Sequence, residues 1–375
     1  MENSGYKRVV VKVGTSTLTR TSGRIDLPYI AQLVDQIARV RETGTEVLLV
    51  SSGAITAGLE RLGLATERPD DMPTLQAAAA IGQVELIRQY AYCAANRNMA
   101  VGQVMITRKD TSDRVSYLHA RNTLLHLLEL GALPIINEND TVAIDEIKFG
   151  DNDTLAATVA TLVGADLVIV LSDIEGLYTA DPRIDEDAKL LDHVGAFTSK
   201  IVASAGGVGT KTGSGGMASK VAAARVLMRA GIPMVITEGH KPDVLCKVMA
   251  GAGGGTVFEN DESVGSVNAR KLWIALGDAA HGAVHIDDGA RKALTKGGGS
   301  LLPVGVTGVT GRFDSGDVIN IRDSAGHLIG RGISGYSSNE VKRAAGKRSE
   351  EIEADPSFGN LRHTAVIHRD EMIIF

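Results

Sequence analysis

The first fifty residues carry the pattern that most restricts how this chain can fold. A β-branched run, KRVVVKV at 7–13, precedes apolar residues at helical spacing across 27–43, and a second apolar run, EVLLV, follows at 46–50. Gly14 ends the first run and Gly44 ends the helical pattern. A strand, a helix and a strand in this order form a βαβ unit with a right-handed crossover. The start of the chain therefore predicts a parallel sheet.

The same alternation continues to about residue 258. Apolar runs and helical patterns follow one another, with Gly, Asn, Asp and Ser between them. The predicted strands cover 100–106, 133–137, 166–171 and 233–237, and the predicted helices cover 74–97, 114–130, 153–162 and 217–229. We predict one α/β domain over residues 1–258, a doubly wound, mainly parallel sheet with helices on both faces.

The composition changes after Val257. Residues 259–269 are polar and resemble a linker, and the chain then has short β runs separated by Gly, Asp and Ser turns. These runs are AVHI, SLLPVGV, DVINI and HLIGRGI. Regular short strands with turn signals predict a small β-barrel or sandwich with a flanking helix over 270–355. Residues 356–375 are expected to form a C-terminal tail.

Composition limits the class of protein. The chain has 375 residues, 44% of them hydrophobic, which is enough for a large core without disulfides. Its two cysteines, Cys93 and Cys246, lie far apart in apolar surroundings and are expected to be buried thiols. The N-terminus lacks a signal-peptide core and no apolar run is long enough to span a membrane, so we expect a cytoplasmic protein. A net charge of −6 argues against a protein that wraps nucleic acid.

The segment KTGSGGMASK at 211–220 is the strongest single motif. Its glycines leave backbone amides open to close approach, a helix is predicted to begin at Met217, and Lys220 follows in the first turn. Amides, a helix N-terminus and a lysine together favour phosphate binding. The alternative is a flexible Gly/Ser loop without a function. No GxxxxGK[ST] motif occurs in the chain, which excludes a P-loop nucleotide site.

Polar residues follow the other predicted strands. Lys12 lies inside the first strand and is followed by Gly14, Ser51 and Ser52 follow the second strand, and Ser172-Asp173 follow a later one. Two acidic clusters, NEND at 137–140 and GDND at 150–153, enclose an excursion of the chain. In α/β proteins ligands bind beyond the carboxyl ends of the strands. Each feature also has an alternative without a function. The acidic clusters could be ordinary turns, Ser51 and Ser52 could cap a helix, and Lys12 could be a solvated lysine on an edge strand.

Taken together, these motifs resemble those of the glutamate 5-kinases, members of the amino acid kinase family. The matching segments are VKVGTS at 11–16, VSSGAITAG at 50–58, NEND, GDND, SDIEGLYTADP at 172–182 and TGSGGMASK at 212–220. One departure is Ser172, where the family more often has Thr, and the hydroxyl is kept. HGAVHIDDGA at 281–290, SLLPVGVTGVTGRFDSGD at 300–317 and GRGISGYSS at 330–338 resemble the PUA domain that bacterial members carry.

The resemblance implies an activity and a set of site residues. The activity is phosphorylation of the side-chain carboxylate of L-glutamate by ATP, with Mg²⁺ on the phosphates, as the first step of proline biosynthesis. The residues implied as catalytic are Lys12, Asp153 and Lys220. Those implied to bind ATP are Lys12, Gly14, Ser172, Asp173, Ser214, Gly215, Gly216, Met217, Ala218, Ser219 and Lys220. Those implied to bind glutamate are Ser52, Asp140 and Asn152.

The resemblance also implies partners and regulation. Proline is expected to inhibit competitively near the glutamate site, with the excursion at 141–149 as the candidate loop. A homodimer or homotetramer and contact with a glutamyl phosphate reductase are expected. Two alternatives remain. One is a kinase for acetylglutamate, aspartate or UMP, against which GDND and the second domain argue. The other is RNA binding through the PUA-like domain, against which its near-neutral charge argues.

Overall fold

The computed structural model describes two compact units, which divide between Ser266 and Val267. Each unit is described here by itself. The described residues are 5–20, 24–65, 69–112, 114–142, 152–182, 184–198, 201, 204, 216–260, 282–348, 351–352 and 365–374. Most of the predicted linker, from residue 261, therefore lies outside the described residues.

The first unit is built on one eight-stranded sheet with the order β3-β4-β2-β1-β5-β7-β8-β6. Neighbouring strands are parallel except β7 and β8, which are antiparallel. The strands are β1 (Arg8–Val13), β2 (Glu46–Ser51), β3 (Val101–Ile106), β4 (Leu133–Glu138), β5 (Leu167–Ser172), β6 (His193–Val194), β7 (Met234–Glu238) and β8 (Thr256–Phe258). β1 lies between β2 and β5, and its valines are buried on both faces, as expected of a central parallel strand.

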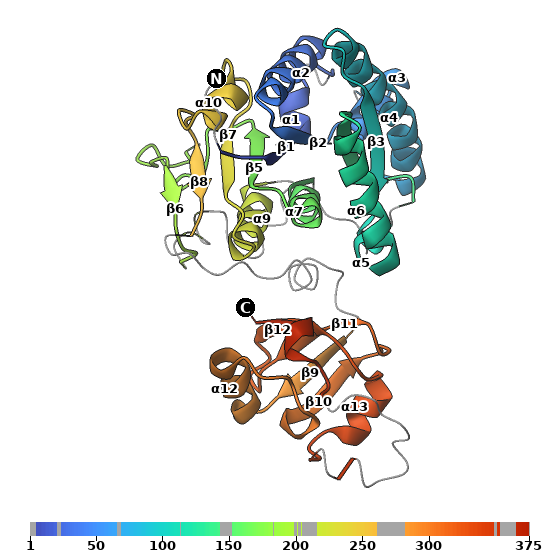
Figure 1. The fold of residues 1–375 in the computed structure, drawn as a ribbon, viewed down its shortest axis with the longest axis vertical. Helices are drawn as coiled ribbons and strands as arrows, with labels where there is room; N and C mark the ends of the chain where they lie inside the picture. Colours follow the sequence, from blue (N-terminus) through green and yellow to red (C-terminus); the bar gives the residue numbers. More distant parts are fainter. Residues whose placement is uncertain are drawn as a thin grey trace. The chain divides into compact units, whose positions relative to one another are not determined.

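Helices cover both faces of this sheet (Figure 1). The helices with bounds in the first unit are α1 (Thr15–Leu18), α2 (Leu27–Glu42), α3 (Ala54–Arg61), α4 (Met72–Ala95), α5 (Arg108–Ser112), α6 (Arg114–Glu129), α7 (Asn152–Val163), α9 (Met217–Arg229) and α10 (Val244–Met249). α2 packs against α4 and α10 on one face, while α7 packs between α6 and α9 on the other. The predicted doubly wound α/β fold is confirmed.

Local sequence explains where α2 begins and ends. The Asp26 side chain accepts a hydrogen bond from the Tyr29 amide, and Pro28 occupies the first turn, where its missing N–H costs nothing. Gly44 follows with a φ of 87°, a left-handed conformation that glycine adopts easily. The apolar face of α2 then packs onto the valines of β1 in the main hydrophobic core.

α3 and α4 cross with their backbones in direct contact. A Cβ atom added to Gly58 would lie 1.8 Å from the Ala78 carbonyl oxygen, and one added to Gly82 would lie 1.8 Å from the Ala54 carbonyl oxygen. Only glycine permits this approach. α3 and the short elements α1, α5, α10, β6 and β8 were not predicted from the sequence, because each has too few residues to show a periodic pattern.

The second unit contains a five-stranded sheet with the order β10-β9-β11-β12-β13. Its elements are β9 (Gly282–Ile286), α12 (Asp288–Gly297), η1 (Pro303–Gly305), β10 (Val306–Gly311), β11 (Val318–Arg322), β12 (Leu328–Ile333), α13 (Ser338–Ala344), η3 (Arg369–Glu371) and β13 (Met372–Ile374). β9 and β11 pair in parallel, and the other pairs are antiparallel.

Two details of the second unit differ from the expectation. SLLPVGV is not one strand, because Pro303 lacks an amide hydrogen and begins a 3-10 turn before β10. Residues 356–375 were expected to form a tail, but they contribute β13, which pairs with β12. Ile367, in the same segment, forms a β-bridge to Leu301. The last residues therefore belong to the sheet of this unit.

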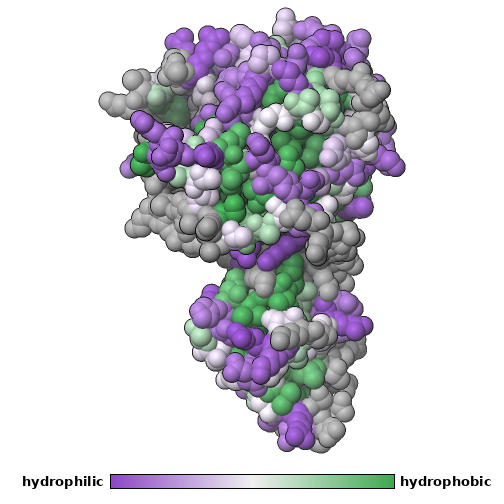
Figure 2. Space-filling view, turned by 90° about the vertical axis from the view of Figure 1, so that its left-hand side faces the viewer, coloured by the Kyte–Doolittle hydropathy of each residue, from purple (hydrophilic) through white to green (hydrophobic). Residues whose placement is uncertain are grey.

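The surface of each unit carries both hydrophilic and hydrophobic residues. On the face that Figure 2 shows, hydrophobic residues gather in areas bordered by hydrophilic ones. In the second unit, a mainly apolar hollow of about 310 Å³ lies beside α12 and is lined by Leu294, Leu301, Leu302 and Val304 among others. No helix within the described residues is both long and apolar enough to cross a membrane.

Candidate active site

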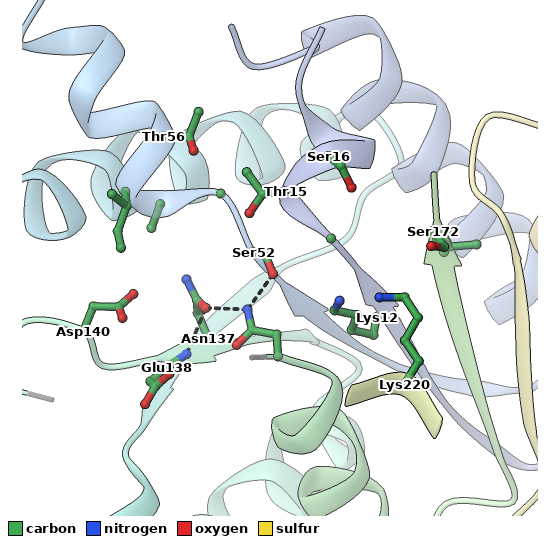
Figure 3. Close-up of a pocket in the computed structure, with 16 residues that line it drawn as sticks. Lys12, Thr15, Ser16, Ser52, Thr56, Asn137, Glu138, Asp140, Ser172 and Lys220 are labelled. Atoms are coloured by element: carbon green, nitrogen blue, oxygen red, sulfur yellow. Dashed lines mark hydrogen bonds between the residues drawn. The ribbon is translucent and has the colours of Figure 1, made fainter. Parts of the chain in front are cut away.

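A cavity of about 360 Å³ lies at the carboxyl ends of β4, β2, β1 and β5, which are four consecutive strands of the sheet. This is the place where ligands bind in open α/β sheets. Figure 3 shows the side chains that line it. They are Lys12, Gly14, Thr15, Ser16, Ser52, Gly53, Ala54, Ile55, Thr56, Asn137, Glu138, Asp140, Asn152, Leu171, Ser172 and Lys220.

Lys12 and Lys220 meet on one carboxylate. Lys12 Nζ lies 2.6 Å from Asp153 Oδ1, and Lys220 Nζ lies 3.1 Å from Asp153 Oδ2. Ser219 Oγ also donates to Asp153 Oδ2, at 3.0 Å. Asp153 is 1% exposed and the two lysines 4% and 6%, so this cluster is almost fully buried. In Figure 3 the two amino groups approach each other at the cavity wall.

The charges of the cluster keep Asp153 ionised. Burial by itself raises the pKa of a carboxyl group, but the nearby Lys12 and Lys220 ammonium groups outweigh it and hold the pKa of Asp153 below its ordinary value. Two buried cations thus pair with the same carboxylate at the cavity wall. Such a cluster is suited to a polyanionic ligand, because phosphate oxygens can bind two adjacent ammonium groups at once.

The N-terminus of α3 faces the same cavity. Gly53 has a φ of 98° at the N-cap position and provides no side-chain cap, so the first amides of the helix are left for another acceptor. Ser52, Ala54 and Thr56 line the cavity beside it. A helix N-terminus with an adjacent hydroxyl favours a carboxylate or phosphate.

A chain of amides crosses the floor of the cavity (Figure 3). Asn152 Nδ2 donates to Ser52 Oγ at 2.8 Å, to the Ser51 carbonyl oxygen at 3.2 Å and to Asn137 Oδ1 at 2.9 Å. Asn137 Oδ1 also accepts from the backbone amide of Glu138 at 2.9 Å. The N-terminus of α7 is therefore attached to the ends of both β2 and β4.

Acidic side chains lie on the β4 side. Glu138 and Asp140 both line the cavity, and β4 is separated from β1 by β2 in the sheet. The cavity thus has carboxylates toward one end and the lysines toward the other, as Figure 3 shows. One end suits a cationic group and the other suits an anionic group.

Only some of the residues expected to contact ATP line the cavity. Lys12, Gly14, Ser172 and Lys220 line the cavity, and the Ser172 hydroxyl donates to Asp173 Oδ1 at 3.2 Å. Gly216, Met217, Ala218, Ser219 and Asp173 are described but are not among the lining residues. Ser214 and Gly215 lie outside the described residues.

Several lining residues were not among the predicted site residues. Asn137 and Glu138 belong to the NEND cluster, of which only Asp140 was assigned, and Thr56 lies in α3, which was not predicted. The signal that could have found the N-terminus of α3 is Gly53, the second residue after the end of β2. Within the described part of the chain, no group of three or more His, Cys, Asp or Glu side chains is placed to hold a metal ion.

Comparison with known proteins gives matches over both units. Residues 7–238 match the Amino acid kinase family, and residues 282–355 match the PUA domain. A protein of Caldanaerobacter subterraneus subsp. tengcongensis named glutamate 5-kinase is 46% identical over 98% of this chain and 97% of its own. A glutamate 5-kinase of Dehalococcoides mccartyi is 42% identical over 100% of both chains.

A solved structure supports the fold. The carbamate kinase of Giardia lamblia bound to AMP-PNP aligns with 69% of this chain and 100% of its own, with a TM-score of 0.51 and 19% sequence identity. At this identity the likeness concerns the fold alone, which is the α/β architecture of the first unit.

Proposed function

Because this chain belongs to the glutamate 5-kinases of the amino acid kinase family, we propose that it transfers the γ-phosphoryl group of ATP to the side-chain carboxylate of L-glutamate. A carboxylate oxygen forms the new bond to phosphorus, the bond to the bridging oxygen breaks, and ADP leaves. The observation that carries the proposal is the buried Lys12–Asp153–Lys220 cluster at one end of a cavity whose other end is acidic.

The chemistry fits the residues that the cavity offers. A carboxylate is already ionised at neutral pH, so the nucleophile needs no general base. Phosphoryl transfer instead requires alignment of the reactants and neutralisation of charge on the transferring group. Lys12 and Lys220 supply this charge, and Asp153 orients both ammonium groups between turnovers. These lysines act mainly in the transition state, where the negative charge is redistributed.

The nucleotide lies on the β5 side in this proposal. Ser172 and Asp173 contact the adenine or ribose, Gly14 and residues 214–219 provide backbone amides, and the N-terminus of α9 faces the phosphates. Mg²⁺ enters as part of the substrate, bound through the phosphate oxygens of ATP.

Glutamate lies on the β2 and β4 side. Its α-carboxylate meets Ser52 and the open amides at the N-terminus of α3, and its α-ammonium meets Asp140 and Asn152. The side-chain carboxylate then extends toward the lysines. This orientation matches the direction of charge along the cavity.

We also propose the finer properties that the family resemblance implies. The reaction is the first step of proline biosynthesis in the cytoplasm, and proline competes with glutamate. The candidate loop for proline, 141–149, lies outside the described residues from 143 onward. The chain forms a homodimer or homotetramer, and because the acyl phosphate product reacts with water, it is passed to a glutamyl phosphate reductase.

One assay tests the proposed activity. Purified protein with ATP and Mg²⁺ should release ADP only when L-glutamate is present, and hydroxylamine should trap the product as a hydroxamate. Aspartate, acetylglutamate and UMP serve as alternative acceptors. Proline should raise the KM for glutamate without changing the KM for ATP. ADP release with one of the other acceptors and none with glutamate would overturn the assignment.

A further inference from the structure

Gln83 on α4 continues the amide chain away from the cavity. Asn137 Nδ2 donates to Gln83 Oε1 at 3.0 Å, a contact between residues 54 positions apart. Gln83 is 6% exposed and Asn137 is 3% exposed, so water does not replace either partner. Gln83 does not line the cavity. Its neighbour Gly82 lies at the close crossing of α3 and α4, which brings this part of α4 near the carboxyl ends of the strands.

Backbone groups determine which way each amide in the chain points. The Glu138 amide can only donate, so the Asn137 atom facing it is the oxygen. The Ser51 carbonyl can only accept, so the Asn152 atom facing it is the nitrogen. Asn137 must therefore present its nitrogen to Gln83, whose oxygen is the acceptor.

The polarity of this chain decides what Asn152 offers to a ligand. Its amide nitrogen is already directed at three acceptors of the protein. Among the described residues, no hydrogen bond reaches Asn152 Oδ1. A carbonyl oxygen at a cavity wall recognises a donor, and the donor on an amino acid is its ammonium group. Ser52 Oγ accepts from Asn152, which leaves its own hydrogen for a carboxylate.

We propose that Gln83 is a positioning residue for substrate recognition, and that through Asn137 it holds Asn152 with its oxygen toward the α-ammonium group of the substrate. This inference rests on the proposed function. Without Gln83, the buried Asn137 amide loses its acceptor and leaves its rotamer to find another. Asn152 then loses one of its three anchors, and the recognition of the ammonium group weakens.

The test is a double-mutant cycle on the KM for glutamate. Gln83→Met removes the acceptor while keeping the length of the side chain. It should raise the KM for glutamate roughly 10-fold, the value of one hydrogen bond to a charged group, with the KM for ATP and kcat nearly unchanged. Gln83→Met added to Asn152→Ala should have no further effect, because Gln83 acts through Asn152.

Two further variants separate positioning from a general effect on the helix. Gln83→Glu keeps an oxygen acceptor at the same place and should restore most of the KM. Gln89→Met makes the same change six residues later on α4, where the Gln89 amide nitrogen donates to Glu85 away from the cavity, and should behave as wild type. If Gln83→Met does not fold, Gln83→Asn withdraws the acceptor by one methylene and takes its place.

The outcomes distinguish this inference from the proposed function. Wild-type protein and Gln89→Met without glutamate-dependent ADP release would refute the proposed function itself. If wild type is active but Gln83→Met and Asn152→Ala raise the KM for glutamate independently, so that their effects multiply in the double variant, the role of Gln83 would be overturned. The role of Gln83 would also be overturned if Gln83→Met raised the KM values for glutamate and ATP equally, or raised neither.

Discussion

Replacement of Asp153 by Asn tests how the Lys12–Asp153–Lys220 cluster is held together. Asn keeps the size of the side chain and one oxygen, but removes the charge that Lys12 and Lys220 share at 2.6 and 3.1 Å. At an effective dielectric constant near 20, these distances correspond to attractions of about 6 and 5 kcal/mol. Desolvation of three buried ions offsets much of this gain, at several kcal/mol per ion. The net loss expected on breaking the cluster is about 3–5 kcal/mol of stability in the free protein.

The effect on activity should have a different pattern. Two lysines without a shared anion repel each other and leave the geometry needed for phosphoryl transfer, so kcat should fall by about 10²- to 10³-fold. The KM for ATP should stay unchanged or decrease, because the phosphates meet an uncompensated pair of cations. ATP should therefore stabilise the variant at least as much as it stabilises wild type.

The assay combines glutamate-dependent ADP release with thermal denaturation, each with and without MgATP. Gln89→Met provides the control for substitution of a polar residue outside the cluster. A folded Asp153→Asn variant with wild-type kcat would refute the orienting role of the carboxylate. A variant that loses ATP binding in proportion to kcat would show that Asp153 contributes to nucleotide affinity instead.

Folding lowers the pKa of Asp153, so its charge stabilises the fold at neutral pH. This stabilisation is lost as the pH falls from about 4 through the lowered pKa, so the free energy of unfolding should fall less steeply with acid in Asp153→Asn than in wild type. Lys220→Met should lower kcat more than it raises either KM, in steady-state assays. Asp140→Ala should mainly raise the KM for glutamate, and an unchanged KM would contradict the assigned subsite. Gly58→Ala should destabilise the protein by at least about 1–3 kcal/mol in thermal denaturation, whereas Gly254→Ala, where the added Cβ makes an ordinary 3.7 Å contact, should not.

Long periodic elements could be predicted from the sequence, and so could the edge of the sheet at which the cavity lies. Lys12 illustrates the reason. A lysine within a run of valines is costly unless an anion meets it, so the residue itself indicates a nearby carboxylate or ligand. The structure supplies Asp153 as that partner, from a segment 141 positions later. The pattern indicated the need for an anion but not its source.

Other parts of the site depend on contacts that no local pattern contains. α3 has eight residues and begins two residues after β2, so only the short Ser52-Gly53 link announces it and its apolar pattern is too short to be recognised. Gln83 lies in a helix where a polar residue is ordinary, and its contact with Asn137 depends on the close crossing at Gly58 and Gly82 that brings α4 near the strand ends. Side-chain hydrogen bonds across tens of residues follow from the tertiary fold rather than from propensity.

The position of β1 at the middle of the sheet has a consequence for how such enzymes change over evolution. On the proposed assignment, the strands on one side of β1 serve the acceptor and those on the other side serve the nucleotide, and the two sets meet at the Lys12–Asp153–Lys220 cluster. Substitutions at the ends of β2 and β4 can then select a new acceptor while the nucleotide half is inherited unchanged. Directed evolution of acceptor preference should accordingly accumulate its substitutions in residues 52–56 and 137–152, and leave β5 and α9 intact.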